Sequence, residues 1–282
     1  MNIKSYFKQK IADYIYSNEV IPHLYERLSS YIDVSMQKNN AAILANVEYL
    51  KDKRQHNSKV IYTCLTGGYD SLPLQLYCNK EYDYVCFTDN QTLLVNGGYG
   101  AWQIFPLQFS DMDDTRNNRW HKLHPHILFP DYEESIYIDS NMQILDNFVF
   151  EQISNKKSDI VIPKHNKCNC VFDEIERVLK YVVAKGRESE ENVLKMKVFL
   201  EKENMPHNFG QTENNFIYRK HNDPKIIKIM EDWWHFIAEY SKRDQLSSSY
   251  VFWKNGISLD DIYIPNLREE KSHICFYNHF GR

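Results

Sequence analysis

The sequence predicts an α/β protein whose mostly parallel sheet is flanked by helices. From about residue 59 onward, short apolar runs that end in polar or glycine residues alternate with segments of helical spacing. Strands that are buried on both faces are apolar throughout, and strands that alternate with helices are typical of a parallel sheet. A chain of 282 residues is long enough for one such domain and an appendage.

The first part of the chain has a different pattern. From Ile3 to about Leu50 apolar residues recur at spacings of three and four, which predicts two or three amphipathic helices. The polar run from Lys51 to Ser58 resembles a linker, so we expect a helical appendage over residues 1–57 and a catalytic domain over residues 58–282. Charges interrupt the apolar residues at the start, which disfavours a secretory signal or a membrane span. The appendage is expected to pack on the domain, to form a homo-oligomer contact or to attach to the inner membrane surface.

The remaining elements follow in order along the chain. The predicted strands are residues 60–67, 82–89, 102–107, 135–145, 159–165 and 215–221. The predicted helices are residues 114–128, 172–184, 188–203 and 224–240.

Composition excludes one class of partner. The net charge of −4 and the pI near 6.3 give no general attraction to nucleic acid, which proteins bind through concentrated Lys and Arg. The six cysteines do not have the spacing of a zinc knuckle, so we interpret them as reduced thiols of a cytoplasmic protein.

Ligands of an open α/β sheet collect at the carboxyl ends of its strands. Two predicted strands end in suitable residues. Thr66, Gly67, Gly68 and Tyr69 follow the first, where the glycines let backbone amides approach a ligand. Asp89 closes the second and could accept hydrogen bonds from a base or ribose of the donor. Both segments are also ordinary turn sequences.

A basic stripe follows in the next predicted helix. Arg116, Arg119 and Lys122 recur every third residue, so we expect them on one face, where they could bind a diphosphate. A solvated basic face is the common alternative. Trp120 and Leu123 indicate that much of this helix is buried, which favours cations that point into a cleft.

An acid and an amide interrupt the predicted strand 135–145. Asp139 and Asn141 are two residues apart, and alternate residues of a strand share a face. Their oxygens could bind a divalent cation, Mn²⁺ or Mg²⁺, that neutralises a departing diphosphate. Asp-Ser-Asn is equally suited to a turn at the strand end.

Taken together, these segments resemble the glycosyltransferase-like family called domain of unknown function six-one-six. The landmarks are Thr63–Asp70 with its Gly-Gly-Tyr-Asp end, His121–Ile144, Lys167–Val178 and Arg243–Trp253. The family is known from plant cell-wall and mucilage proteins and from bacterial surface-polysaccharide loci, such as those for capsule or lipopolysaccharide. The resemblance runs from about Lys59 to the C-terminus and implies a GT-A-like, Rossmann-like fold and a retaining glycosyltransferase.

The resemblance also implies roles for particular residues. Asp139 matches the first metal ligand of an Asp-x-Asp motif, Asn141 stands where the second Asp would be, and His279 matches a terminal metal-binding histidine. Asp244 matches an acidic element that contacts the reacting sugar, which makes it the catalytic candidate together with Glu213. Candidates for the acceptor side are Gln211, Arg243 and Gln245.

The sequence thus predicts an enzyme that transfers a sugar from a nucleotide-sugar donor, a UDP-sugar, to a glycan or glycolipid acceptor. A non-catalytic glycan-binding or nucleotide-binding module is an alternative, for which Asn141 is the best support. A hydrolase of lipid amides is the third possibility, and it lacks sequence support because neither G-x-S-x-G nor H-E-x-x-H occurs.

Overall fold

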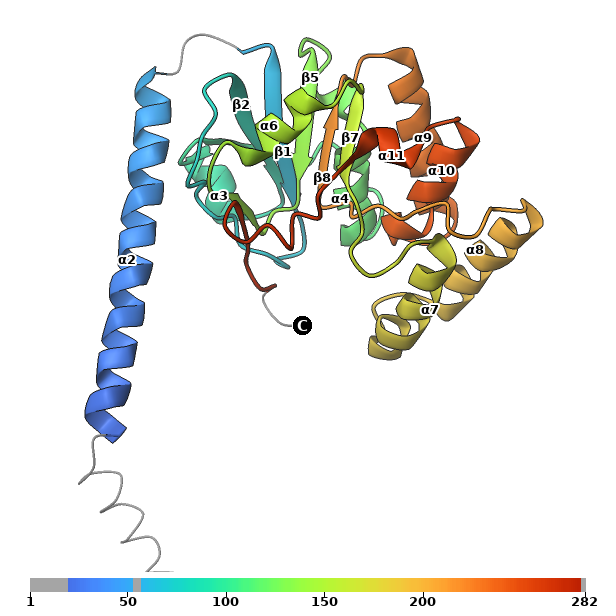
Figure 1. Ribbon diagram of the computed structural model, residues 1–282. Helices are drawn as coiled ribbons and strands as arrows, with labels where there is room; N and C mark the ends of the chain where they lie inside the picture. The colour runs from blue at the N-terminus through green and yellow to red at the C-terminus, as the bar shows by residue number, and fades with distance from the viewer. Residues whose placement is uncertain (1–19, 53–56, 280–282) are drawn as a thin grey trace, which may run out of the picture. The chain divides into compact units, whose positions relative to one another are not determined.

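The computed structural model describes residues 20–52 and 57–279 (Figure 1). The chain divides into two compact units, Met1–Leu44 and Ala45–Arg282. One uninterrupted helix, α2 (Val20–Asp52), occupies the described part of the region in which the sequence predicts two or three helices. The part of that prediction before residue 20 and residues 53–56 of the predicted linker lie outside the described residues.

The last turns of α2 belong to the second unit. The Asn46 side chain donates to the Gln75 carbonyl over 2.8 Å and accepts from the Ala101 amide over 2.7 Å. The Tyr49 side chain is buried, and its hydroxyl donates to the Tyr82 carbonyl over 2.8 Å. The second unit therefore begins upstream of residue 58, where the sequence predicts the start of the domain.

An eight-stranded sheet forms the centre of the second unit, with the order β3-β4-β2-β1-β5-β8-β7-β9. Its strands are β1 (Lys59–Leu65), β2 (Tyr82–Thr88), β3 (Gly98–Tyr99), β4 (Trp102–Pro106), β5 (Glu134–Ile138), β7 (Ile160–Pro163), β8 (Phe216–Arg219) and β9 (Tyr263–Ile264). Strands β4, β2, β1 and β5 are parallel neighbours, whereas β8 runs antiparallel to both β5 and β7. This arrangement confirms the predicted α/β class with a mostly parallel sheet.

Helices cover both faces of this sheet. They are α3 (Gln91–Asn96), α4 (Asp114–Leu123), α5 (Pro125–Leu128), α6 (Phe148–Asn155), α7 (Val171–Tyr181), α8 (Glu190–Lys202), α9 (Pro224–Glu239), α10 (Ser248–Lys254) and α11 (Leu259–Ile262), with short 3₁₀ turns at η1 (Val183–Lys185) and η2 (Asp244–Leu246). Alternate residues of β1 point into two different cores, Tyr62 into one and Ile61 into the other. Apolar side chains of α4, α7, α8, α9 and α10 fill the first core, and those of α6 and the end of α2 fill the second. Figure 1 shows α9, α10 and α11 grouped beside β7 and β8.

The predicted strand 135–145 is interrupted in its middle. Strand β5 ends at Ile138, and the Met142 amide donates to the Asp139 carbonyl over 3.0 Å, which closes a turn. After the turn, β6 (Met142–Ile144) leaves the main sheet and pairs with β10 (Ile274–Phe276). The turn alternative for Asp-Ser-Asn is therefore the one that the structure adopts.

The antiparallel direction of β8 determines which loops meet. The segment before β8 lies at the same edge of the sheet as the segments after β5 and β7. The Asp139 amide donates to the Asn215 carbonyl over 2.9 Å, and the His165 amide donates to the Gln211 carbonyl over 2.9 Å. Three segments that are far apart in sequence are thus joined by backbone hydrogen bonds at one edge.

None of the helices in the described ranges combines the length and the apolar character that a membrane span requires.

We predict that Asn46→Ala destabilises the second unit. The substitution leaves the buried Ala101 amide and Gln75 carbonyl without their partner, which should lower the free energy of unfolding by about 2–4 kcal/mol. Chemical denaturation of the full chain measures this change. Asn39→Ala, an exposed position on the same helix, serves as the control and should be nearly neutral. Equal stability of the two variants would contradict the assignment of the end of α2 to the second unit.

Candidate functional site

A polar cavity of about 540 Å³ opens at the edge of the sheet where these loops meet. It is lined by Tyr69, Arg119, Lys122, Asp139, His165, Asn166, Lys167, Glu174, Arg177, Glu213, Asn214, Asn215, Arg243, Asp244, Gln245, Arg268 and His279. Six of these residues are Lys or Arg and four are Asp or Glu, which gives a surplus of two positive charges when the histidines are neutral. The cavity therefore favours an anionic, hydrogen-bonding ligand.

Four charged residues form an ion-pair cluster in this cavity, namely Arg119, Lys122, Asp139 and Asp244. The Lys122 ammonium lies 2.5 Å from Asp244 Oδ2 and 3.9 Å from Asp139 Oδ1. Arg119 Nε lies 3.3 Å from the same Asp244 oxygen. The side chains of Lys122 and Asp244 are almost completely buried, with 2% and 4% exposure, so their charges are poorly screened by water.

The charge state of Asp244 follows from this geometry. Burial alone would raise the pKa of its carboxyl group, but the attraction of Arg119 and Lys122 is stronger and holds the pKa well below its usual range. Asp244 is therefore a fixed negative charge near neutral pH and cannot supply a proton.

Buried hydrogen bonds fix the end of α4, on which Lys122 stands. The Tyr62 hydroxyl donates to the Lys122 carbonyl over 2.8 Å, and Arg219 donates to the same carbonyl over 2.7 Å. Arg219 also donates to the Tyr62 hydroxyl over 2.6 Å and is completely buried. A cation at the C-terminal end of a helix is favourable because the helix dipole is negative there. Strands β1 and β8 thus position the ammonium of Lys122.

Only part of the predicted basic stripe faces the cavity. Arg119 and Lys122 line it, whereas Arg116 pairs with Asp113 over 2.7 Å and donates to the Ile237 carbonyl over 2.9 Å. The physical reason is the helix period. Residues three apart on an α-helix are rotated by about 60° from alignment, so Arg116 and Lys122 differ by about 120°. Arg116 joins α4 to α9 and does not contact the cavity.

Hydrogen bonds within the protein hold the predicted glycine loop. Gly67 has a φ of 63°, and its amide donates to the Asp89 carboxylate over 2.8 Å. Thr66 donates through its hydroxyl to the Asp114 carbonyl over 2.9 Å. Of the predicted donor contacts in these two loops, Thr66, Gly67, Gly68 and Asp89 do not line the cavity, whereas Tyr69 does. Asp89 therefore connects two strand-end loops in this structure.

The three predicted metal ligands do not all face the cavity. Asp139 lines the cavity, but Asn141 does not, because its amide nitrogen donates to the Tyr277 carbonyl over 2.8 Å. His279 lines the cavity, and its Nδ1 lies 2.5 Å from Asp70 Oδ1. The turn at Asp139, Ser140 and Asn141 separates the two side chains that a straight strand would have aligned.

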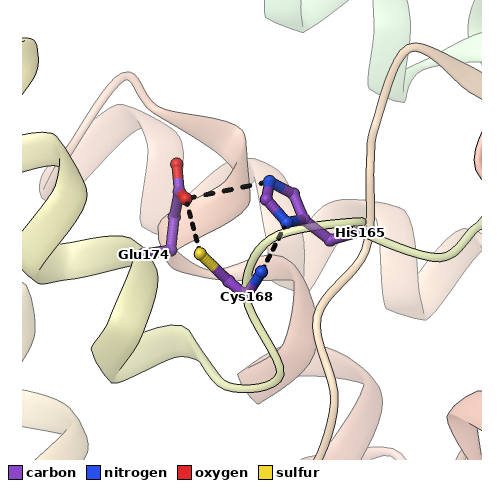
Figure 2. Close-up of side chains that lie close together, drawn as sticks. All are labelled: His165, Cys168 and Glu174. Atoms are coloured by element: carbon purple, nitrogen blue, oxygen red, sulfur yellow. Dashed lines mark hydrogen bonds and ion pairs between the residues drawn. The ribbon is translucent and has the colours of Figure 1, made fainter. Parts of the chain in front are cut away.

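A second group of side chains, the His165 cluster, consists of His165, Cys168, Glu174, Arg177 and Glu213. Figure 2 shows the side chains of His165, Cys168 and Glu174 pointing toward one another. His165 Nε2 lies 3.8 Å from Glu174 Oε2 and 3.4 Å from Glu213 Oε2. Burial, with Glu174 nearby, raises the pKa of the Cys168 thiol to about 11, so the sulfur stays protonated and donates to Glu174 over 3.4 Å.

Two contacts determine the tautomer and the charge of this cluster. His165 Nδ1 accepts from the Lys167 and Cys168 amides over 3.1 and 2.9 Å, so the proton of the neutral ring is on Nε2. Burial lowers the pKa of His165, which keeps the ring neutral. His165, Cys168 and Glu174 are close enough together for a metal site, but Arg177 donates to Glu174 Oε2 over 2.9 Å. A guanidinium on the central oxygen and a proton on the facing imidazole nitrogen both oppose a cation there.

Of the predicted catalytic and acceptor-side residues, all but one line the cavity. Asp244, Glu213, Arg243 and Gln245 line the cavity, and Glu213 pairs with Arg268 over 2.9 Å. Gln211 is completely buried outside it and donates to the Gln245 carbonyl over 2.7 Å. Gln211 thus supports the backbone of the segment that carries Asp244.

Other residues of the site are not predicted by the sequence as cavity residues. Asp70 does not line the cavity itself, but it contacts the cavity residue His279, which is 209 residues away in the sequence. His165 and Arg177 lie in or beside a segment that carries the family resemblance, but no local pattern gives them a role. No local sequence pattern assigns a role to Arg268.

Comparison with known proteins identifies a family for this chain. A family model described as TOD1/MUCI70, glycosyltransferase-like domain, matches residues 51–267. The chain belongs to this family. The enzyme class predicted from the sequence, a glycosyltransferase, is the class that the family description gives.

The solved structures that are similar to this chain include two glycosyltransferases. The apo structure of the bifunctional glycosyltransferase WbbM has 13% sequence identity and a TM-score of 0.40, and the match covers 73% of this chain and 38% of that one. Apo mouse xyloside xylosyltransferase 1 has 10% identity and a TM-score of 0.41, and the match covers 74% of this chain and 84% of that one. This chain thus spans much less than two thirds of WbbM. No curated protein sequence matches the chain.

We predict that Asp244→Asn destabilises the protein, because Arg119 and Lys122 lose the carboxylate that compensates them in a buried site. The expected loss in free energy of unfolding is about 3–5 kcal/mol at neutral pH. The lowered pKa of Asp244 means that its stabilising contribution is complete above its unfolded pKa, about 3.9, and disappears as the pH falls through the folded value. The difference between the two proteins should therefore be constant from about pH 8 to 5 and shrink below about pH 4.

Denaturant titrations at several pH values measure this difference. The control is Asp159→Asn, which breaks an exposed ion pair with Lys220 and should cost less than about 1 kcal/mol. A difference that grew on acidification would contradict the assigned charge state of Asp244.

Proposed function

We propose that this chain transfers a sugar from a nucleoside diphosphate sugar, a UDP-sugar, to a hydroxyl group of a glycan acceptor. The observation that carries the proposal is the ion-pair cluster, which presents buried cations around a permanently ionised carboxylate in a polar cavity. The family supports the reaction class, and the cluster supports the role of each residue.

The cations suit the diphosphate of the donor. A nucleoside diphosphate carries at least two negative charges, and the cavity has a surplus of two positive charges. Arg243 has a buried Nε without a hydrogen-bond partner among the described residues, whereas the Nε of Arg119 faces Asp244 over 3.3 Å. Because buried donors are normally satisfied, the Arg243 nitrogen supports direct contact with a ligand oxygen. As the bond to the sugar breaks, fixed cations stabilise the charge that develops on the diphosphate.

Asp244 suits the positive charge that develops on the transferred sugar. Glycosyl transfer passes through a centre with oxocarbenium character, and an ionised carboxylate beside that centre lowers its energy. Because the pKa of Asp244 lies well below its usual range, the carboxylate stays charged throughout the reaction. Its role in this proposal is electrostatic.

The His165 cluster suits the acceptor. The imidazole presents Nε2–H, and Glu213 and Glu174 present carboxylate oxygens, so donors and acceptors alternate as they do on neighbouring sugar hydroxyls. Glu213 is fixed by Arg268 and is the residue that we propose orients the attacking hydroxyl. Tyr69 offers an aromatic face for the base of the donor.

The finer features of the proposal come from the family resemblance. They are a GT-A-like fold, retention of configuration at the transferred sugar, and an acceptor in surface-polysaccharide biosynthesis. We also propose a cytoplasmic location, with contacts to a second copy or to the inner membrane surface through the N-terminal helix.

We predict that UDP stabilises the protein. A ligand that binds only the folded state at about 100 times its dissociation constant adds about 2.7 kcal/mol to the free energy of unfolding. Thermal denaturation with UDP, GDP and uridine measures the effect, and uridine, which lacks phosphates, should give no shift. If no nucleoside diphosphate shifts the melting temperature at millimolar concentration, the donor site is wrongly assigned.

The Asp244→Asn variant also separates binding from transfer. Removal of one negative charge leaves a larger positive surplus in the cavity, so UDP should bind at least as tightly as to the unaltered protein. Transfer should fall by about a hundredfold or more, because the charge beside the reacting centre is lost. Calorimetry and product formation measure the two effects on protein shown to be folded by circular dichroism. Full activity in this variant would exclude Asp244 as the catalytic carboxylate.

A further inference from the structure

The resemblance to metal-dependent transferases raises the question of whether these residues fit a divalent cation. Mn²⁺ and Mg²⁺ require several oxygen ligands, usually with anionic carboxylates among them. The predicted ligands are Asp139, Asn141 and His279. Three features of their surroundings bear on the fit.

The first feature is the ammonium group beside Asp139. Lys122 Nζ lies 3.9 Å from Asp139 and 2.5 Å from Asp244, so it lies between the two carboxylates that could serve a cation from the cavity. Arg119 adds a second positive charge at 3.3 Å from Asp244. Two carboxylates facing two cations leave no net negative charge for a divalent ion.

The second feature is the orientation of Asn141. Its Oδ1 is buried without a hydrogen-bond partner among the described residues, which by itself would suit a cation. The residue, however, does not line the cavity, and its amide nitrogen is held by the Tyr277 carbonyl. A single neutral oxygen outside the cavity does not replace the second carboxylate of the motif.

The third feature is the partner of His279. Its Nδ1 is paired with Asp70, and the other Asp70 oxygen accepts from the Ser140 hydroxyl over 2.9 Å. These contacts fasten the C-terminal segment to the turn after β5. A carboxylate on Nδ1 is also the usual partner of a histidine that binds a metal through Nε2, so this contact by itself does not oppose a cation. Asp70, however, does not line the cavity and brings no further carboxylate to Asp139.

We propose that the donor diphosphate binds without a divalent cation, and that Lys122 supplies the positive charge that a metal would otherwise provide. The inference rests on the proposed function. Lys122 is suited to this role because its carbonyl is fixed by Tyr62 and Arg219 and its charge is held by Asp244. Together with Arg119 and Arg243 it meets the charge of the diphosphate with side chains alone.

Calorimetric titration of UDP into the full chain tests the inference. One titration contains EDTA, and the others contain millimolar Mn²⁺ or Mg²⁺. We expect dissociation constants that agree within about twofold, a difference of about 0.4 kcal/mol. Titration of Mn²⁺ alone should give no saturable binding at millimolar concentration.

Two variants assign the effect to Lys122. Lys122→Met should weaken UDP binding by about tenfold or more, and added Mn²⁺ should not restore it. Lys220→Met, at an exposed ion pair outside the cavity, is the matched control and should bind UDP normally. If Lys122→Met does not fold, Arg119→Met tests the same charge requirement.

The possible outcomes separate this inference from the proposed function. UDP binding that disappears in EDTA and returns with Mn²⁺ would overturn the inference and leave the proposed function intact. No binding under any condition would remove the proposed function and the inference with it. Equal binding in all conditions, lost only in the cavity variants, supports both.

Discussion

The contact between Lys122 and Asp244 is the interaction on which the site depends. Burial of two charges is expensive, and only close pairing with further hydrogen bonds makes it tolerable. Here the lysine comes from the last turn of α4 and the aspartate from η2, after α9. Trp233 of α9 donates to the Asp244 carbonyl over 3.0 Å, which fixes the segment that carries the aspartate. The packing of α4 against α9 therefore brings the two charges together.

This arrangement explains why the structure can keep strong charges in a nearly dry position. Hydrogen bonds hold the backbone of each partner. Tyr62 and Arg219 donate to the Lys122 carbonyl, and Trp233 donates to the Asp244 carbonyl. The charged groups consequently need little reorganisation when a ligand arrives. Preorganised charge of this kind is the main source of electrostatic stabilisation in enzyme active sites.

The sequence predicts the strands well because their apolar runs are long enough to be buried on both faces, as in β1 and β2. It also predicts that Arg119 and Lys122 face a cleft, because apolar neighbours on α4 require burial. It fails for Arg116 because equal spacing of three does not match the helix period. It fails for Asn141 because the choice between a strand and a turn depends on pairing with β10, far along the chain. His165, Arg177 and Arg268 meet only through tertiary contacts, which no local pattern encodes.

Strand β8 has a consequence for how this chain can vary. It begins directly after Asn215, which lines the cavity, and ends at Arg219, which holds the end of α4. Four extended residues span about 13 Å. The length of β8 therefore sets the distance between Asn215 on the acceptor side and Arg219, which holds the Lys122 carbonyl. A one-residue insertion would turn Arg219 to the other face of the sheet and change the spacing of the site at the same time. Longer loops would leave this distance unchanged, whereas a longer β8 would not.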